Sequence, residues 1–464
     1  MRERPAPIAT APERPQLWVD ASSRPGGDGS RERPLKQIPA ALPERVDLHL
    51  VSGLYEGPFA LPVGARVEGH GEVVLHAAAP AVVVTGEGLA LLRLSVQGGA
   101  VGLELTGQTW LEAVHVSGHR EVGVDVRPGA RLDAQRLEVV GTIAGALGVR
   151  ATNATLHVSG ASFTGDLKHG FWLNGGTAVI ADARSLGGNT LLNARQADLT
   201  VQRARAIGGR GPAVFLSGGA ARVEDVQVDG HEVGLQTRPG VRLDVRRFSA
   251  SRPSSAGLVL MGATGTLREV SVTAAGPGGG VQLLGADVEL TDLNVRDAGA
   301  MGVFVRKGAV RLRQLTVSGV RAEVNVDGSR VLGDALMLRD AVVDVDDVSV
   351  EDVEGAAVYA AAFARVTVGR LEAWRTGGGL LLAERGAAVT AKQLVLHGTL
   401  GPAVIVPDGA RVDVGRLSIG GQAELPIAAD CRAGAAVSVS VLETTLEQPT
   451  ADCITIGRTG PATP

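Results

Sequence analysis

Two carboxylates and an arginine are the side chains of this sequence best suited to acid–base chemistry. Glu104 lies in GLEL, Asp125 lies in GVDV, and Arg150 takes the same place in GVRA. If these phrases are neighbouring strands, the two carboxylates lie about 5 Å apart, close enough to act as an acid/base or nucleophile pair on a glycosidic bond. The alternative is that the two carboxylates have no catalytic role and that Arg150 neutralises their charge. Glu104, Asp125 and Arg150 are therefore the candidate catalytic residues.

The same place in the next similar phrases is taken by aromatic and amide side chains. The polar and aromatic members are Trp172, Asn193, Phe215, Gln236 and Gln282. Ring faces interleaved with hydrogen-bonding amides are the two components that sugar sites combine. The pattern predicts a ligand-binding face, and the alternative is a patch that a loop covers.

Further along the chain this place becomes wholly apolar. Its residues there are Phe304, Met337, Tyr359, Leu381 and Ile405. An apolar run of this length exceeds the scattered surface residues that need no explanation. We expect it to contact a partner, a second copy of the chain or a covering segment. The candidate cover is the insert at 320–334, where one interval is longer than the others.

A group of carboxylates is concentrated in residues 338–355. Such hard oxygen ligands could bind Ca²⁺, but strand alternation spreads them around several corners, which favours a solvated acidic coil. The sequence contains no zinc-ligand spacing, phosphate loop or nucleophile elbow. We therefore expect no cofactor and no metal site.

All these phrases belong to one repeat with a period of about 22 residues. Each repeat opens with a short alternating phrase such as GVDV, passes a turn, and closes with two more alternating stretches. Three short strands per repeat, separated by tight corners, predict an all-β fold. We expect a single-stranded right-handed parallel β-helix, a solenoid of about 15 coils with caps at both ends.

Alternation decides which positions of a repeat face solvent. In G-V-x-V the two valines face the core, so the x positions of successive coils form one column on the surface. The last strand of each coil gives a second column for comparison. That column runs from His115 and Glu138 through Gln227 and Ser249 to Ser418 and consists mostly of polar residues. It predicts ordinary solvated surface.

Composition excludes several classes of protein. The 464 residues carry a formal charge of −4, with arginines and carboxylates mixed throughout, so nucleic acid is not an expected partner. No stretch reaches the roughly 20 apolar residues of a membrane span. A secretory signal sequence is absent from the start or has been removed.

The two cysteines, Cys431 and Cys453, lie near the C-terminus and outside the regular repeats. A disulfide between them would close the end of the solenoid and indicate an oxidising compartment. The alternative is a pair of buried free thiols. We expect the disulfide, and with it a secreted, periplasmic or cell-surface location.

Residues near the N-terminus carry a resemblance to a known group of proteins. Trp18–Asp20, the loop residues Gly27–Gly29, Pro34 with Leu35, and Gly53–Glu56 follow the order strand, Asp/Gly-rich loop, Pro-led short helix, strand. This resembles the N-terminal cap of secreted right-handed parallel β-helix proteins of the pectate-lyase-like superfamily. The resemblance implies a disordered tail at 1–15, a cap at 16–60, a β-helix at 61–421 and a C-terminal cap at 422–464.

The superfamily includes lyases, glycosidases, adhesins and passive scaffolds, so the resemblance leaves the chemistry open. The clustered Asp, Asn-Thr-Asp and Gly-His-Gly signatures of its polygalacturonase-like members are missing here. We therefore expect an extracytoplasmic, non-catalytic scaffold that binds a polysaccharide or a surface protein along the first-strand face. The alternative is a polysaccharide lyase or glycosidase that uses Glu104 and Asp125.

Overall fold

The computed structural model describes residues 14–323, 333–421, 423, 425–447, 449 and 451–460. The chain divides into two compact units, Met1–Leu167 and Lys168–Pro464. Each unit is described by itself. The expected tail at 1–15 lies almost wholly outside the described residues.

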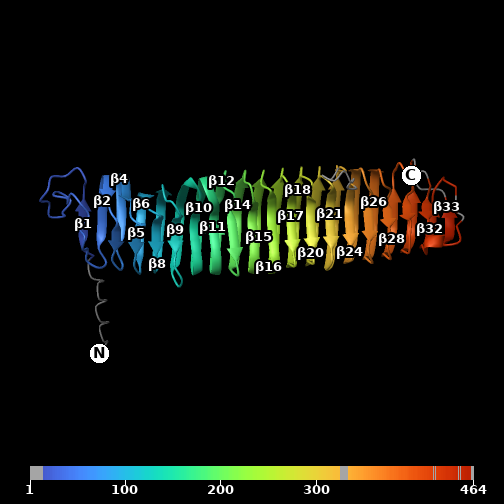
Figure 1. Ribbon diagram of the computed structural model, residues 1–464, viewed down its shortest axis with the longest axis horizontal. Helices are drawn as coiled ribbons and strands as arrows, with labels where there is room; N and C mark the ends of the chain where they lie inside the picture. The colour runs from blue at the N-terminus through green and yellow to red at the C-terminus, as the bar shows by residue number, and fades with distance from the viewer. Residues whose placement is uncertain are drawn as a thin grey trace, which may run out of the picture. The chain divides into compact units, whose positions relative to one another are not determined.

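The first unit is built from parallel strands that stack turn upon turn (Figure 1). Its strands are β1 Gln16–Val19, β2 Asp47–Glu56, β3 Phe59–Leu61, β4 Arg66–Ala77, β5 Ala81–Thr85, β6 Leu89–Gly98, β7 Val101–Leu105, β8 Gln108–Ser117, β9 Val122–Val126 and β10 Arg131–Ser159.

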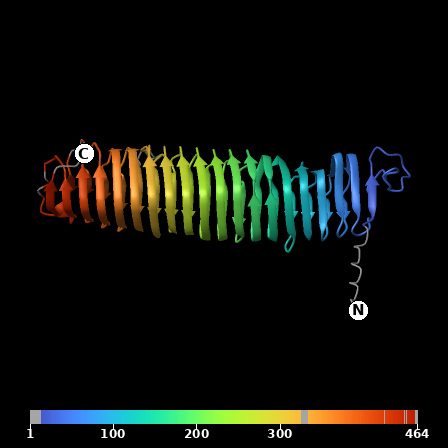
Figure 2. The same cartoon turned by 180° about the vertical axis from the view of Figure 1, so that it is seen from behind.

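The second unit repeats the same stacking, which is also visible from behind in Figure 2. Its strands begin with β11 Ser162–Ala181, which crosses the unit boundary, and continue with β12 Arg184–Leu186, β13 Leu192–Arg195, β14 Asp198–Ile207, β15 Pro212–Asp229, β16 Val233–Ser251, β17 Ala256–Met261, β18 Thr264–Thr273, β19 Gly279–Leu284, β20 Asp287–Arg296, β21 Met301–Arg306, β22 Ala309–Ser318, β23 Asp334–Arg339, β24 Val342–Val353, β25 Val358–Ala361, β26 Arg365–Thr376, β27 Leu381–Ala383, β28 Ala388–Leu396, β29 Val404–Val406, β30 Arg411–Ile419, β31 Ile427–Ala429, β32 Ala436–Glu443 and β33 Ile454–Gly460.

Each turn of the second unit contains the three expected short strands. In one turn β13 supplies the first strand and the longer β14 supplies the second and third. All three pair in parallel with the next turn, as Asn193 with Phe215, Val201 with Val223, and Arg205 with Gln227 show. The expected parallel β-helix is confirmed.

The core consists of inward-facing aliphatic side chains that stack on their equivalents in the next turn. Leu235, Leu258 and Val281, for example, are buried and pair with one another in three successive first strands. Burial of such side chains contributes about 1.5 to 3 kcal/mol each. The alternation of valine and leucine with polar residues therefore fixes which face of each strand turns inward.

The corner between the second and third strands is formed in a way that the sequence does not reveal. A single residue there adopts a left-handed backbone, and in several turns it is charged rather than glycine, as with Arg203 at φ 51°, Asp225 at φ 55° and Arg247 at φ 50°. This conformation costs a non-glycine residue about 1 kcal/mol or more. Ion pairs between neighbouring corners, such as Arg203 with Asp182 at 2.7 Å, accompany it.

The N-terminal region differs from its expected form in one respect. β1 pairs with β2, and the buried Tyr55 donates its hydroxyl hydrogen bond to the carbonyls of Val19 and Val51. The expected short helix after Pro34 does not form, since the described residues 34–45 contain no helix. Pro39 and Pro43 explain this, because proline removes a helix hydrogen bond and clashes with the preceding turn.

The C-terminal region contains the expected disulfide. Cys431 lies in η1 (Cys431–Ala433), the only helix among the described residues, and is bonded to Cys453, with the two Cα atoms 5.3 Å apart. β31 and β32 pair with β29 and β30 in the regular register. Regular turns therefore continue past residue 421, into the segment expected to be a separate cap.

The described residues form about 18 turns, where the sequence predicts about 15. The additional turns lie at the ends, because β2 pairs in parallel with β4 despite one register shift, and β32 pairs in parallel with β33. Of the insert at 320–334, residues 324–332 lie outside the described residues. Val320 and Asp334 on either side are both buried within the coil. No helix among the described residues is long and apolar enough to cross a membrane.

Candidate functional site

The three candidate catalytic residues form a column in the first unit. Glu104 in β7 pairs with Asp125 in β9, and Asp125 pairs with Arg150 in β10. The strand register thus brings these side chains together as the repeat predicts. Asp125 is only 2 % exposed, although its position was expected to face solvent.

Arginines occupy both carboxylates of this column. Arg150 donates two hydrogen bonds of 2.7 Å to the two oxygens of Asp125, a bidentate pair. Arg127 contacts Glu104 and Asp125, at 3.1 Å in each case. The hydrogen bonds to Asp125 raise the pKa of Arg150 above its ordinary value. These arginines neutralise the charge of the two carboxylates, which is the arrangement that the sequence offers as the alternative to a catalytic pair.

The ring and amide residues share one column in the second unit. Parallel pairing joins Trp172 to Asn193, Asn193 to Phe215, and so on through each first strand to Tyr359. We call this set the first-strand column. Its members are Trp172, Asn193, Phe215, Gln236, Val259, Gln282, Phe304, Met337, Tyr359, Leu382 and Ile405.

The prediction is wrong for one member of this column. Leu381 pairs with Val358 on the core side and is 1 % exposed, whereas Leu382 pairs with Tyr359 and takes the outward place. The stretch GGGLLLAE explains the error, because a run of leucines hides the alternation on which the register depends. The other expected members lie where they were predicted.

The polar members of the first-strand column are only partly satisfied. The Asn193 side chain is 7 % exposed, its amide nitrogen lies 3.4 Å from Nε2 of His169, and its carbonyl oxygen is buried without a partner among the described residues. Burial lowers the pKa of His169 to about 4, with Lys168 and Arg195 acting in the same direction. Gln282 donates to the carbonyl of Gly278 at 2.6 Å. Asn193 thus offers an acceptor between Trp172 and Phe215 in the register.

The apolar end of the column is half-buried. Phe304, Met337 and Tyr359 occupy successive turns. Tyr359 donates its hydroxyl hydrogen bond to Glu384 at 2.5 Å. Burial, followed by this contact with a carboxylate, raises the pKa of Tyr359 to about 12. The phenol therefore stays neutral and holds the outer edge of the column in place.

The comparison column on the third strands forms as predicted in successive turns of the second unit, except that Ser418 near its end is buried, at 8 % exposed. Arg205, Gln227, Ser249 and Ser271 pair in successive turns, and all of them are exposed or half-buried. The contrast between a polar third-strand face and an aromatic first-strand face is therefore a property of the folded chain.

The carboxylates of residues 338–355 pair with arginines of neighbouring turns. Asp344 lies 3.8 Å from Arg311, and Glu354 lies 3.8 Å from Arg321. Within the described ranges no group of three or more His, Cys, Asp or Glu side chains is arranged to hold a metal ion. Asp344 and Glu354 are thus engaged in ion pairs between turns.

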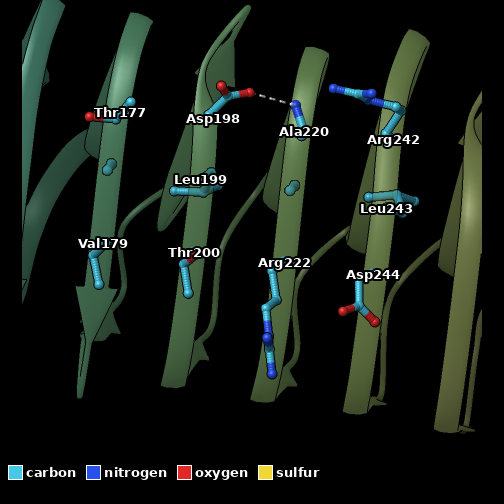
Figure 3. Close-up of a pocket in the computed structure, with 12 residues that line it drawn as sticks. Thr177, Val179, Asp198, Leu199, Thr200, Ala220, Arg222, Arg242, Leu243 and Asp244 are labelled. Atoms are coloured by element: carbon cyan, nitrogen blue, oxygen red, sulfur yellow. Dashed lines mark hydrogen bonds between the residues drawn. The ribbon is translucent and has the colours of Figure 1, made fainter.

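A shallow hollow of about 500 Å³ lies on the second-strand face of the second unit. Figure 3 shows two rows of side chains along it, one with Asp198, Ala220 and Arg242 and one with Arg222 and Asp244. The small side chain of Ala220 leaves the space between longer neighbours. The hollow has alternating charges and no aromatic side chain among its lining residues.

Two aromatic stacks escaped the sequence analysis. In the first unit Trp18 stacks on His49 with ring centres 4.5 Å apart. In the second unit Trp374 stacks on His397 at 4.9 Å, with the ring planes 7° apart. Both stacks join residues of neighbouring turns. An alignment of all outward positions of the repeats, and not only of the two columns, would have placed these residues side by side.

Neither a protein-family model nor a curated protein sequence matches this chain. Among solved structures it is similar to pectate lyase Pel9A, at 12 % identity and a TM-score of 0.40, over 54 % of this chain and 78 % of that one. It is also similar to the catalytic unit of a GH87 α-1,3-glucanase from Streptomyces thermodiastaticus strain HF3-3, at 14 % identity and a TM-score of 0.27, over 89 % and 70 %. A third is the receptor-binding domain of the siphovirus 9NA tailspike, at 11 % identity and a TM-score of 0.31, over 88 % and 74 %. Identities and scores this low carry no activity or ligand over to this chain.

Proposed function

We propose that this protein is an extracytoplasmic, non-catalytic scaffold that binds a polysaccharide along the first-strand column of its second unit. The observation that carries the proposal is the column itself, in which Trp172, Phe215 and Phe304 are interspersed with three amide side chains and Val259 in continuous parallel register. Strand spacing places successive members about 4.8 Å apart. An extended polymer lying along the column would meet rings and hydrogen-bonding groups in turn.

Two further features support a binding role over a catalytic one. The rings of Trp172 and Phe215 and the amide of Gln236 are only half-buried, so they remain partly open to a ligand. The candidate catalytic carboxylates, by contrast, are held by Arg127 and Arg150. A side chain that donates or accepts a proton during catalysis has to be free to reach the substrate. The disulfide supports the extracytoplasmic location, because disulfides persist in oxidising compartments.

The test is affinity electrophoresis of the full chain through gels that contain a soluble polysaccharide. Xylan, hydroxyethylcellulose, starch, polygalacturonate and alginate form the panel. We expect at least one polymer to retard the protein, and Trp172→Ala with Phe215→Ala to restore its mobility. The matched control is Gln227→Ala with Ser249→Ala on the third-strand face, which should leave the retardation unchanged. Migration of wild type and variants at one rate in every gel would refute the proposal, and a protein partner would then be sought.

A further inference from the structure

A hollow of about 640 Å³ opens in the second unit, away from the first-strand column. It lies at the corners that follow the third strands of four successive turns, and Arg321, Glu354, Thr376 and Leu400 mark those turns. A volume of this size falls within the range of small-molecule sites. The expected functions of the chain make no use of it.

Stacked rings from two turns adjoin the hollow. Trp374 ends the third strand of one turn, and His397 stacks on it from the next turn, with ring centres 4.9 Å apart. His397 also lines the hollow. Trp374 is half-buried and is not itself among the lining residues. His397 therefore supplies the aromatic wall of the hollow, and Trp374 supports it from behind by stacking.

The orientation of the imidazole is fixed by an acid. Nε2 of His397 lies 2.9 Å from Glu372, and Glu372 is itself held by Arg370. This hydrogen bond leaves Nδ1 of His397 available to a ligand. Ordered side chains lose less freedom on binding, so the wall is preorganised.

The charges around the hollow cancel in pairs. Arg375 contacts Asp352 with one hydrogen bond of 2.9 Å and also contacts Glu351. Arg321 lies 3.8 Å from Glu354. These groups are partly exposed, so they retain N–H groups and oxygen lone pairs for further hydrogen bonds. Paired charges favour a ligand that is polar and uncharged.

The rim adds an apolar contact. Leu400 lines the hollow and is 89 % exposed, so its apolar side chain is available at the rim. An uncharged ring with one apolar face and several hydroxyl groups would match the rings, the rim and the paired charges together.

We propose that this hollow is a second ligand site, which holds a neutral pyranose ring of an uncharged polysaccharide. The imidazole of His397 contacts the C–H groups of the sugar, and Trp374 holds that ring in position by stacking on it. Arg375 and Asp352 exchange hydrogen bonds with its hydroxyls. The site is formed by residues that do not belong to the first-strand column, so it does not depend on ligand binding there.

The experiment is isothermal titration calorimetry on the full chain. Cellohexaose, maltohexaose and laminarihexaose are the neutral probes, and tri-galacturonic acid is the charged comparator. We expect at least one neutral probe to bind with a Kd of about 1 mM or tighter. Trp374→Ala and His397→Ala should each weaken that binding about 10-fold or more. Leu400→Arg, at an exposed position that folding does not need, should weaken it as well, which keeps the test valid if a ring variant fails to fold.

Trp110→Ala is the matched control, because it removes a half-buried outward ring in the first unit that neither proposed site uses. It should bind the neutral probe within about twofold of wild type. Trp172→Ala reports separately on the first-strand column. The proposal is overturned if no neutral probe binds at about 10 mM, if binding survives Trp374→Ala and His397→Ala, or if tri-galacturonic acid binds more tightly. Binding lost in Trp172→Ala but kept in Trp374→Ala would overturn this site and support the first-strand column.

Discussion

The outward positions of the first strands have the same backbone in both units but different side-chain chemistry. In the first unit Asp125 and Arg150 satisfy each other with two hydrogen bonds. In the second unit the corresponding positions hold rings and amides, and Asn193 keeps an acceptor without a partner among the described residues. A parallel β-helix presents every side chain of a column at one spacing. Whether a stretch is self-satisfied or open to a ligand is therefore decided by residue type alone.

Two buried aspartates show the same contrast on a smaller scale. Asp125 is 2 % exposed and has two arginine partners. Asp334, at the start of β23, is 1 % exposed and accepts one hydrogen bond from the backbone of Ala356, while its other oxygen has no partner among the described residues. Burial raises the pKa of Asp334 to about 6. The same side chain is paired in one unit and isolated in the other.

The largest expected effect concerns the corrected register in the second unit. Leu381→Ala removes a side chain that is 1 % exposed and should lower the free energy of unfolding by about 2 to 5 kcal/mol. The neighbouring Leu382→Ala removes a half-buried side chain and should cost about 1 kcal/mol or less. Urea unfolding followed by circular dichroism measures both. Equal losses would mean that the two residues do not occupy opposite faces.

The next effect tests the self-satisfied stretch. Asp125→Ala leaves Arg127 and Arg150 without their shared partner and should cost about 2 to 3 kcal/mol in unfolding free energy. The control is Glu138→Ala, whose exposed pair with His115 at 3.2 Å should contribute less than about 1 kcal/mol. If Asp125→Ala keeps wild-type stability but abolishes cleavage of a polysaccharide, the catalytic alternative is correct and the scaffold proposal fails.

A substitution at Asp334 should raise the stability of the protein rather than lower it, by an amount that depends on pH. Its folded pKa of about 6 lies above the ordinary value of 3.8, so folding favours the protonated form. The stabilisation that this group contributes to the folded protein is fully present below pH 3.8 and is lost as the pH rises through about 6. Asp334→Asn should therefore raise stability at pH 7.5 by roughly 1 to 3 kcal/mol and leave it nearly unchanged at acidic pH.

Thermal unfolding of wild type and Asp334→Asn at several pH values provides the measurement. Asp125→Asn is the matched control and should destabilise the protein at pH 7.5, because it removes one partner of a buried ion pair. If both aspartate substitutions changed the stability of the protein in the same direction at pH 7.5, the contrast between the two units would not hold.

The smallest effect on stability is expected at the apolar end of the first-strand column. Phe304→Ser together with Tyr359→Ser changes two half-buried outward side chains and should cost about 1 kcal/mol or less. The double variant should nevertheless lose polymer binding or self-association, measured by affinity electrophoresis and by light scattering. A large loss of stability in a monomer would instead identify a covering segment of the chain itself. No change in any of these properties would show that the apolar end has no role.

The sequence alone determined the features that depend on local periodicity. A period of about 22 residues predicted the parallel β-helix, and alternation within G-V-x-V placed Trp172, Phe215 and Phe304 on one column. The isolated cysteine pair predicted the disulfide. These inferences hold because a strand of period two, repeated at a fixed interval, leaves each side chain only one face to occupy.

Tertiary structure decided whatever depends on contacts between turns. Leu382 rather than Leu381 faces outward because the corner between β25 and β26 is one residue longer than its equivalent in the preceding turn, and a run of leucines cannot show the shift. Trp374 and His397 form a stack only because their third strands pair in one register. The arginines around Asp125 bury a carboxylate whose position alone predicted exposure. Apart from Arg127, which lies two residues from Asp125, these partners are about 20 residues or more apart in the chain, and the conformation of the intervening corners decides whether the two side chains meet.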